Sequence, residues 1–486
     1  MKLLEPLNIN GMVIPNRTLV PAMVTRLSGE DGFVTPDITE RYVRYAKGGI
    51  GLIVVEAMAV HTAKSGPLLR IGEDKFIAGH RDMVKQVHDT SDSKIVPQII
   101  HFMKVARSGW RQTIDSLSVT DIDQIIEQFG DAAARARDAG YDGVELHSAH
   151  AYTLSSFLSR LNPRRDEYDG RTLEGRLRMI GKVMENVRRK VGHDWPVGVR
   201  FLADECIKDG YTADEAKRIA LRMAQLGMDY ISLSIGGKFE DAVYTEGEPL
   251  YPYTGYSGDR CMPGAWYPPL TNAANVAGIK SFLVEHGFAT PVVCAGKIST
   301  PDEAEKILVD GGADIIGMAR QHLADPDWIT KVAEARPDDI VTCIWCNVCK
   351  QLDEKFKEVH CFLWPKHARQ APPDLPGDGP SWSEDGAAFT VTLRDDGAAE
   401  LKWNRAAGDV EGYDIYRAEE NGETSCMEAV KGSRYVDKTV LGGISYVYYV
   451  RAFNSSGHPS PPSNMVNFAP PVPEFGGAPK GVIENA

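Results

Sequence analysis

Eight short apolar runs alternate with segments of helical periodicity along the first two thirds of the chain. Each run has the length of one buried strand and is too short for a buried helix. The runs lie at residues 19–23, 50–56, 95–100, 143–147, 197–200, 230–234, 291–294 and 314–318. Before them, Asn10 and Gly11 stand between apolar residues at 7–14 and predict a short hairpin.

The segments between these runs carry helix start and stop signals. Starts are marked at Thr120-Asp121, Thr212 and Thr300-Pro301, and stops at Gly140, Gly227 and Gly311. Eight strand and helix units predict an α/β fold, a (β/α)8 TIM barrel over residues 1–335. A doubly wound sheet would need a phosphate-binding glycine fingerprint after its first strand. The glycine-rich stretch 47–51 instead precedes a strand, so we interpret it as a tight turn.

After residue 370 the pattern changes. Residues 371–388 are rich in Pro and Gly and predict a linker, whereas residues 389–470 alternate apolar and polar positions, as the strands of a small all-β sandwich do. We interpret residues 471–486 as a tail. The expected inward positions of the sandwich are Trp403, Tyr413, Ile415, Tyr446, Tyr448 and Val450.

The net charge of the chain limits the classes of binding partner that we expect. Fifty-four basic and 67 acidic residues give a net charge of −13, which disfavours nucleic acid and anionic membranes as partners. No apolar run approaches the roughly 18 to 20 residues of a bilayer span, and the N-terminus lacks the apolar segment of a signal peptide. We therefore expect a cytoplasmic protein.

Half of the eight cysteines are concentrated after the predicted barrel, at Cys343, Cys346, Cys349 and Cys361. Three thiols at successive i+3 positions are typical ligands of a [4Fe-4S] cluster, and the fourth can complete the set. Structural zinc is the alternative, although zinc sites usually use two separated Cys-x2-Cys pairs. We interpret residues 336–370 as a cluster-binding segment. The other cysteines, Cys206, Cys261, Cys294 and Cys426, are scattered, as ordinary reduced thiols are.

The sequence LHSAHAY places His147, His150 and Tyr152 directly after the fourth barrel strand. Active sites of barrels form at the carboxyl ends of their strands. Two imidazoles on one loop can donate hydrogen bonds to a single substrate oxygen, and a nearby phenol can protonate a carbon. The alternatives are that the histidines satisfy loop backbone groups or that they bind a metal ion.

The segment 236–271 is too long for an ordinary loop of a barrel and predicts a wall or lid at its mouth. Its aromatic residues favour a bulky or aromatic ligand, with surface packing as the alternative. They are Tyr244, Tyr251, Tyr253, Tyr256, Trp266 and Tyr267.

Several motifs in order give residues 4–331 a resemblance to the old yellow enzyme family. They include PLNINGMVIPNRTLVPAM at the first strand, AGYDGVELHSAHAY at the fourth, then NPRRDEYDGR, AGKIST and DIIGMARQHLADP. The resemblance implies a bound FMN. It places Arg200 and Gln98 at the polar edge of the flavin, Pro21, Ala22, Met23 and Ala57 along its rings, and Gly296, Ala319 and Arg320 at its phosphate.

The cysteine segment extends this resemblance to the iron-sulfur branch of the family, which includes dienoyl-CoA reductase, enoate reductases and trimethylamine dehydrogenase. Val24 stands where the amine dehydrogenase has the cysteine that tethers its flavin, and His147 replaces a tyrosine there. Residues 389–468 resemble a fibronectin type III domain through Trp403 and the Leu441-Gly442-Gly443 approach to Tyr446. We therefore expect no built-in nucleotide-binding module of the kind that these relatives carry.

These features predict a reductase of an activated C=C bond that depends on FMN and a [4Fe-4S] cluster. His147 and His150 would hold the conjugated carbonyl of an unsaturated small molecule, and Tyr152 would protonate its α-carbon. We expect electrons from a donor protein or from transiently bound NAD(P)H, and a homo-oligomer. The alternatives are an amine or alcohol dehydrogenase that passes electrons out through the cluster, and a non-catalytic electron-transfer or assembly subunit.

Overall fold

The computed structural model describes residues 1–63, 66–103, 112–237, 258, 260–265, 267–364, 379–383, 385–419, 425–454 and 459–472. The chain divides into two units, Met1–Pro373 and Asp374–Ala486. Most of the long segment 236–271, with five of its six predicted aromatic residues, lies outside the described residues. Among the described helices, none has both the length and the apolar character needed to cross a bilayer.

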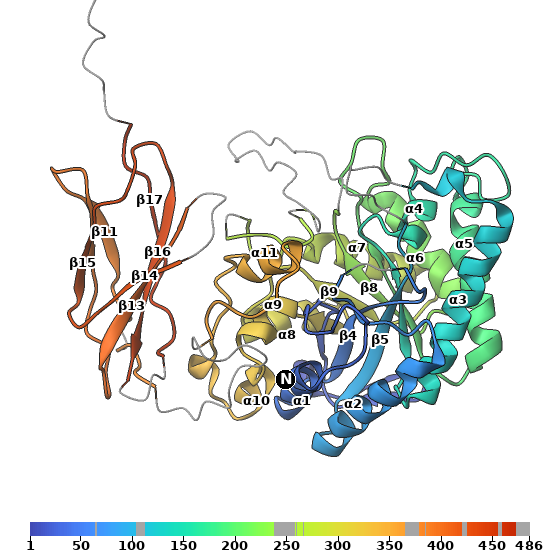
Figure 1. The fold of residues 1–486 in the computed structure, drawn as a ribbon, viewed down its shortest axis with the longest axis horizontal. Coiled ribbons are helices and arrows are strands. Elements are labelled where there is room, and N and C mark those ends of the chain that lie inside the picture. Colours follow the sequence, from blue (N-terminus) through green and yellow to red (C-terminus); the bar gives the residue numbers. More distant parts are fainter. Residues whose placement is uncertain are drawn as a thin grey trace, which may run out of the picture. The chain divides into compact units, whose positions relative to one another are not determined.

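The first unit is a closed barrel of eight parallel strands surrounded by helices, as predicted (Figure 1). The strands are β3 (Thr18–Val20), β4 (Leu52–Ala59), β5 (Lys94–Ile100), β6 (Val144–Ser148), β7 (Val197–Leu202), β8 (Tyr230–Ser234), β9 (Val292–Ala295) and β10 (Ile315–Gly317). The strands follow one another around the barrel, and β10 pairs with both β9 and β3 to close it. The predicted hairpin is formed by β1 (Leu7–Ile9) and β2 (Met12–Ile14).

Helices cover the outside of the barrel. They are α1 (Pro36–Lys47), α2 (Ile77–Thr90), α3 (Val119–Asp138), α4 (Thr153–Leu158), α5 (Leu173–Val191), α6 (Ala213–Gln225), α7 (Ala273–Glu285), α8 (Pro301–Val309), α9 (Ala319–Ala324) and α10 (Trp328–Ala333). Short 3-10 turns lie at Lys2–Leu4, Asp74–Phe76, Ile114–Ser116 and Pro337–Asp339.

The predicted helix starts are partly confirmed. Thr300 accepts a hydrogen bond from Glu303 N at the start of α8 in a capping box. Helix α3 begins earlier than predicted, because Ser118 rather than Thr120 accepts the bond from Asp121 N. The interpretation of residues 47–51 as a turn is confirmed. Gly49, two residues after the end of α1, has a φ of 76°, a conformation that glycine adopts without the steric cost of a side chain.

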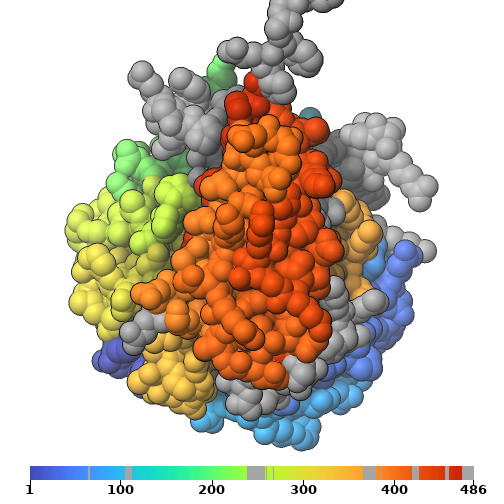
Figure 2. Space-filling model, turned by 90° about the vertical axis from the view of Figure 1, so that its left-hand side faces the viewer, coloured from blue at the N-terminus to red at the C-terminus, as the bar shows by residue number. Residues whose placement is uncertain are grey.

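The second unit contains two antiparallel sheets, as expected for a sandwich. One sheet has the order β11 (Thr390–Leu393), β12 (Ala399–Lys402), β15 (Arg434–Asp437), and the other β14 (Ser425–Val430), β13 (Gly412–Glu419), β16 (Tyr446–Phe453), β17 (Val466–Phe468). The surface of this unit is orange to red in Figure 2. All six expected inward side chains are buried in its apolar core. Its identification as a fibronectin type III domain stays a prediction.

Candidate active site

One cavity at the carboxyl ends of the barrel strands brings together the candidate residues from eight separate stretches of sequence. All three predicted catalytic residues and all nine predicted cofactor residues line it. They are His147, His150, Tyr152, Pro21, Ala22, Met23, Ala57, Gln98, Arg200, Gly296, Ala319 and Arg320. Cys349 of the predicted cluster segment lines the same cavity. The roles assigned to these residues stay predictions, whereas their common location is a structural fact.

Two pairs of polar side chains link neighbouring strands, and one member of each pair, Gln98 or Arg200, lines the cavity. Gln98 on β5 donates from Nε2 to Glu145 Oε1 on β6 at 2.6 Å. Arg200 on β7 donates to Ser232 Oγ on β8 at 2.7 Å, and its positive charge opposes the rise in the pKa of Glu145 that burial causes. We did not predict Glu145, although it shares a strand face with His147 two positions later.

His147 is a neutral imidazole poised to make a hydrogen bond. It is 4% exposed, and its Nδ1 has no hydrogen-bond partner among the described residues. Burial, and then the charge of Arg200, lower the pKa of His147 to about 3. Its ring lies 5.1 Å from the His150 ring and 5.2 Å from the Tyr152 ring, centroid to centroid. A neutral imidazole can donate to a carbonyl oxygen without carrying charge.

His150 has an unusual backbone and two close neighbours. His150 and Ala151 both have a φ of 57°, a left-handed conformation that is costly for residues with a side chain. Nε2 of His150 lies 2.8 Å from Ser234 Oγ and 3.1 Å from Cys261 Sγ. Neither neighbour was predicted. Ser234 ends a barrel strand, which is a usable signal, whereas Cys261 arrives from the long segment 236–271, whose path the sequence does not indicate.

A basic end of the cavity, as we call it, is lined by Gly296, Lys297 and Arg320. Gly296 has a φ of 139°, and a side chain there would place a Cβ 3.0 Å from Asn272 Cβ, so only glycine fits without strain. Arg320 is buried and donates to Pro263 O at 2.8 Å and to Asn347 Oδ1 at 2.6 Å. Lys297 was missed by the sequence analysis. Its Nζ donates to the carbonyls of Gly264 and Ala265, and burial, followed by the charge of Arg320, lowers the pKa of Lys297 to about 8.

These features fit the FMN that the sequence led us to expect. Donors at one end suit the polar edge of a flavin, Pro21, Ala22, Met23 and Ala57 offer an apolar lining, and the basic end suits a phosphate. Tyr267, by contrast, is 8% exposed and does not line this cavity. Its backbone carbonyl accepts a hydrogen bond from Lys297 Nζ.

The four predicted cluster ligands share a largely buried environment. Cys343, Cys349 and Cys361 are buried, and Cys346 is half-buried. Backbone amides of Trp345 and Leu363 donate to Cys343 Sγ and Cys361 Sγ at 3.4 Å. Burial raises the pKa of Cys343 to about 11 and that of Cys346 to about 12, so metal binding there would displace protons.

Within the described part of the chain, no three His, Cys, Asp or Glu side chains are grouped so as to hold one metal ion. Whether the four cysteines bind a [4Fe-4S] cluster or zinc stays a prediction.

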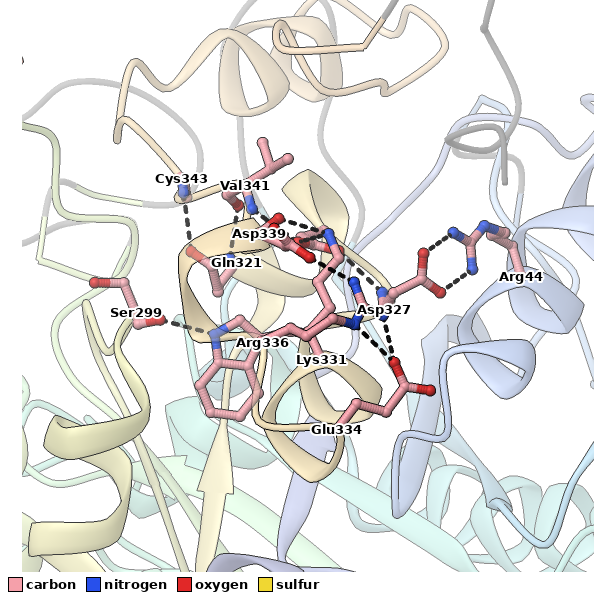
Figure 3. Close-up of polar contacts among 12 residues, drawn as sticks. Arg44, Ser299, Gln321, Asp327, Lys331, Glu334, Arg336, Asp339, Val341 and Cys343 are labelled. Atoms are coloured by element: carbon pink, nitrogen blue, oxygen red, sulfur yellow. Dashed lines mark hydrogen bonds and ion pairs between the residues drawn. The ribbon is translucent and has the colours of Figure 1, made fainter. Parts of the chain in front are cut away.

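Helix α9 ties this cysteine segment to the barrel. Gln321 donates to Val341 O at 2.9 Å and accepts from Cys343 N at 2.8 Å, as Figure 3 shows. Arg320, the residue before it, contacts Asn347, and the Arg320 guanidinium lies 4.7 Å over the Trp345 ring. The last strand of the barrel is thus followed directly by side chains that contact both the cavity and the cysteine loop.

Comparisons with known proteins agree with this architecture. The model of the NADH:flavin oxidoreductase / NADH oxidase family matches residues 2–249 and 272–339. A NADH oxidase of Thermoanaerobacter brockii is 32% identical over 70% of this chain and 52% of its own length. A cinnamate reductase of Clostridium sporogenes is 27% identical over 76% of this chain and 58% of its own length. The chain spans about half the length of the curated relatives it matches.

A solved structure, that of histamine dehydrogenase from Rhizobium sp. 4-9, is similar to this chain with a TM-score of 0.64 and 25% sequence identity. The similarity covers 78% of this chain and 55% of that one. The relatives therefore include proteins named for reductive and for oxidative reactions.

Proposed function

The chain belongs to the NADH:flavin oxidoreductase / NADH oxidase family, a family of FMN-dependent oxidoreductases, and on this premise we propose that it reduces an activated C=C bond. The substrate class is an enone, enoate or enoyl ester. The observation that carries the proposal is the grouping of His147, His150 and Tyr152 in the cavity that Arg200 and Gln98 also line.

The chain's own residues would hold the flavin in three ways. Gln98 would pair with its polar edge, and Arg200 would set a positive charge where negative charge develops. Gly296, Ala319 and Arg320 would hold the phosphate. When bound, FMN would supply a hydride to the β-carbon of the substrate.

The substrate would be oriented by the histidines. His147, which is neutral, would donate a hydrogen bond to the carbonyl oxygen. At His150 the same oxygen would take the place that Cys261 Sγ occupies, 3.1 Å from Nε2. Tyr152 would then give its hydroxyl proton to the α-carbon.

We propose a [4Fe-4S] cluster on Cys343, Cys346, Cys349 and Cys361, through which electrons would reach the cavity. The proximity of Arg320 to Trp345 and Asn347 supports this, because those residues lie between the first and third of these cysteines. The electron donor would be a partner protein or transiently bound NAD(P)H.

The test is anaerobic reoxidation of the reduced protein by a panel of enones, enoates and enoyl-CoA esters. At least one class should reoxidise the flavin rapidly. Tyr152→Phe should slow this by about a hundredfold, because a positioned acid contributes that much or more. His147→Ala should slow it by about a hundredfold to a thousandfold through the lost hydrogen bond. Tyr435→Phe, on β15 of the second unit, is the control and should change nothing. Unchanged rates in the first two variants would refute the assigned roles.

The similarity to histamine dehydrogenase favours amine oxidation as a second candidate. The oxidised protein would then be reduced by an amine in the absence of any alkene. Mixing oxidised protein with histamine or trimethylamine, and reduced protein with cyclohexenone, separates the two directions. Bleaching of the flavin by an amine, without reoxidation by any alkene, would replace the reductase proposal.

A further inference from the structure

A thiol and an imidazole meet at the edge of the cavity. Cys261 Sγ lies 3.1 Å from His150 Nε2, and Ser234 Oγ lies 2.8 Å from the same nitrogen and 3.9 Å from the sulfur. Cys261 is half-buried and lines the cavity, so a small molecule can reach it. A thiol beside an imidazole base and a hydroxyl donor has the surroundings in which thiolates form and react.

A second observation shows that this place can hold a ligand. His147 lines the same cavity, is 4% exposed, and has an Nδ1 with no hydrogen-bond partner in the described part of the chain. Its ring lies 5.1 Å from the His150 ring. An oxygen atom of a ligand seated beside Cys261 can therefore meet an imidazole that is otherwise unsatisfied.

We propose that Cys261 is a nucleophile that forms a thioether with α,β-unsaturated carbonyl compounds, with His150 as its base. The thiol proton moves to His150 Nε2, and the sulfur bonds to the β-carbon. The π electrons of the C=C bond move towards the carbonyl oxygen, and the α-carbon then takes the proton from His150. The addition is redox-neutral and needs neither oxidant nor reductant.

The inference rests on the proposed function only in its choice of compound class, because the addition itself does not involve the flavin. An unsaturated carbonyl in this cavity then has two fates. It is reduced when electrons are present, and it is captured by Cys261 when they are not. Preincubating the oxidised protein with such a compound should therefore block the cavity.

Three other cysteines of the chain have surroundings that differ from those of Cys261. Cys206 is also half-buried, and its Sγ lies 3.9 Å from the carbonyl oxygen of Asp204, an acceptor that cannot take its proton. Cys294 is 1% exposed, and burial raises its pKa to about 12. Cys426 belongs to the second unit. These thiols serve as internal references in the same molecule.

The experiment treats the anaerobic, oxidised holoprotein with N-ethylmaleimide and follows each cysteine by peptide mass mapping. Cys261 should be alkylated at least tenfold faster than Cys206 and Cys426. His150→Gln should reduce that advantage at least fivefold, and Cys261→Ser should abolish the fast phase, whereas Cys206→Ser should retain it. Cyclohexenone in place of N-ethylmaleimide should add its own mass at Cys261.

Alkylation of Cys261 no faster than that of Cys206 in the unaltered protein would overturn the inference, and this comparison needs no variant to fold. An unchanged rate of Cys261 alkylation in His150→Gln would show that His150 is not the base. Flavin reoxidation by the same enone is recorded separately. Labelling without reoxidation contradicts the reductase proposal alone, and reoxidation without labelling contradicts the thiol proposal alone.

Discussion

At the scale of single residues, Glu56 on β4 is a buried acid that the proposed chemistry does not use. It is fully buried, and its Oε2 accepts a hydrogen bond from Thr25 N at 2.8 Å. Its Oε1 has no hydrogen-bond partner among the described residues. Burial raises the pKa of Glu56 to about 7, although the bonds from Thr25 and the charge of Arg41 oppose the rise. The folded barrel therefore holds a proton that the unfolded chain releases near pH 4.5.

Replacing Glu56 with Gln should make the barrel less sensitive to alkaline pH. Between about pH 4.5 and pH 7 the folded state binds more protons than the unfolded state, so stability falls as the pH rises through this window. Gln keeps an acceptor for Thr25 N but carries no charge. Glu56→Gln should match the original protein at pH 4.5 and exceed its stability above pH 7, by at most on the order of 3 kcal/mol.

Urea unfolding at pH 5.0 and pH 8.5, monitored by the release of flavin, measures this effect. The difference between the two midpoints should shrink in Glu56→Gln. Lys306→Ala, which removes an exposed ion pair with Asp310, is the control and should leave the difference unchanged. If the difference between the midpoints shrank equally in both variants, Glu56 would not be the group that binds the proton.

The site residues differ in how far sequence reasoning can find them. His147 and Arg200 are predictable because they stand on barrel strands near their carboxyl ends, where the fold itself collects side chains. Glu145 could have been added on the same argument from strand alternation. Cys261 could not, because its contact with His150 depends on how a long, aperiodic segment returns to the barrel.

At the scale of elements, α9 connects the cavity with the cysteine segment. Gln321 is fully buried and satisfies two backbone groups of the loop that leads to Cys343. Asp325, one turn later, accepts from Val341 N at 2.8 Å and from Lys331 at 2.7 Å. Such bonds between a side chain and a distant backbone leave no periodic pattern, so the sequence predicts the strands and helices but not how this loop is held.

Gln321→Ala should lower the iron content of the protein. The change leaves Val341 O and Cys343 N without their partner, and each buried unpaired group costs about 1 to 3 kcal/mol. The loop would then present Cys343 in more than one position, so fewer molecules would retain a complete cluster. We expect the iron and acid-labile sulfide per chain to fall at least twofold, while FMN absorbance falls less.

Arg336→Ala is the matched control, because Arg336 lies in the same region but makes exposed ion pairs with Glu334 and Asp339. Exposed pairs contribute little to stability, so this variant should keep its iron. A Gln321→Ala protein with full iron content would show that the cysteines are positioned without α9.

At the scale of the whole molecule, the chain joins a barrel to a unit built on different packing. The alternation of apolar residues predicts the inward side chains of the sandwich because every second position of a strand faces the same way. The alternation does not predict at which residue the packed core of the sandwich begins. Trp382 stacks on Tyr413 with 6.2 Å between ring centroids, and Ala387 is buried in the same core, although both lie in the Pro- and Gly-rich stretch interpreted as a linker.

Tyr446→Phe should destabilise the second unit and leave the first unchanged. Tyr446, the first residue of β16, is 1% exposed, and its hydroxyl accepts a hydrogen bond from Leu441 N at 2.9 Å. This is the bond of a tyrosine corner, which anchors the turn before a strand of a sandwich. Phe fills the same space but removes this hydrogen bond, at a cost of about 0.5 to 1.5 kcal/mol.

Because the two units have separate apolar cores, each should give its own unfolding transition. Calorimetry of the full chain should show the transition of the sandwich several degrees lower in Tyr446→Phe. The transition that releases the flavin should stay in place. Tyr416→Phe removes a longer contact, 3.4 Å from Asp414 Oδ2, and should shift the sandwich less. If Tyr446→Phe moved both transitions together, the two units would unfold as one, and the sandwich would be part of the structure that keeps the flavin bound.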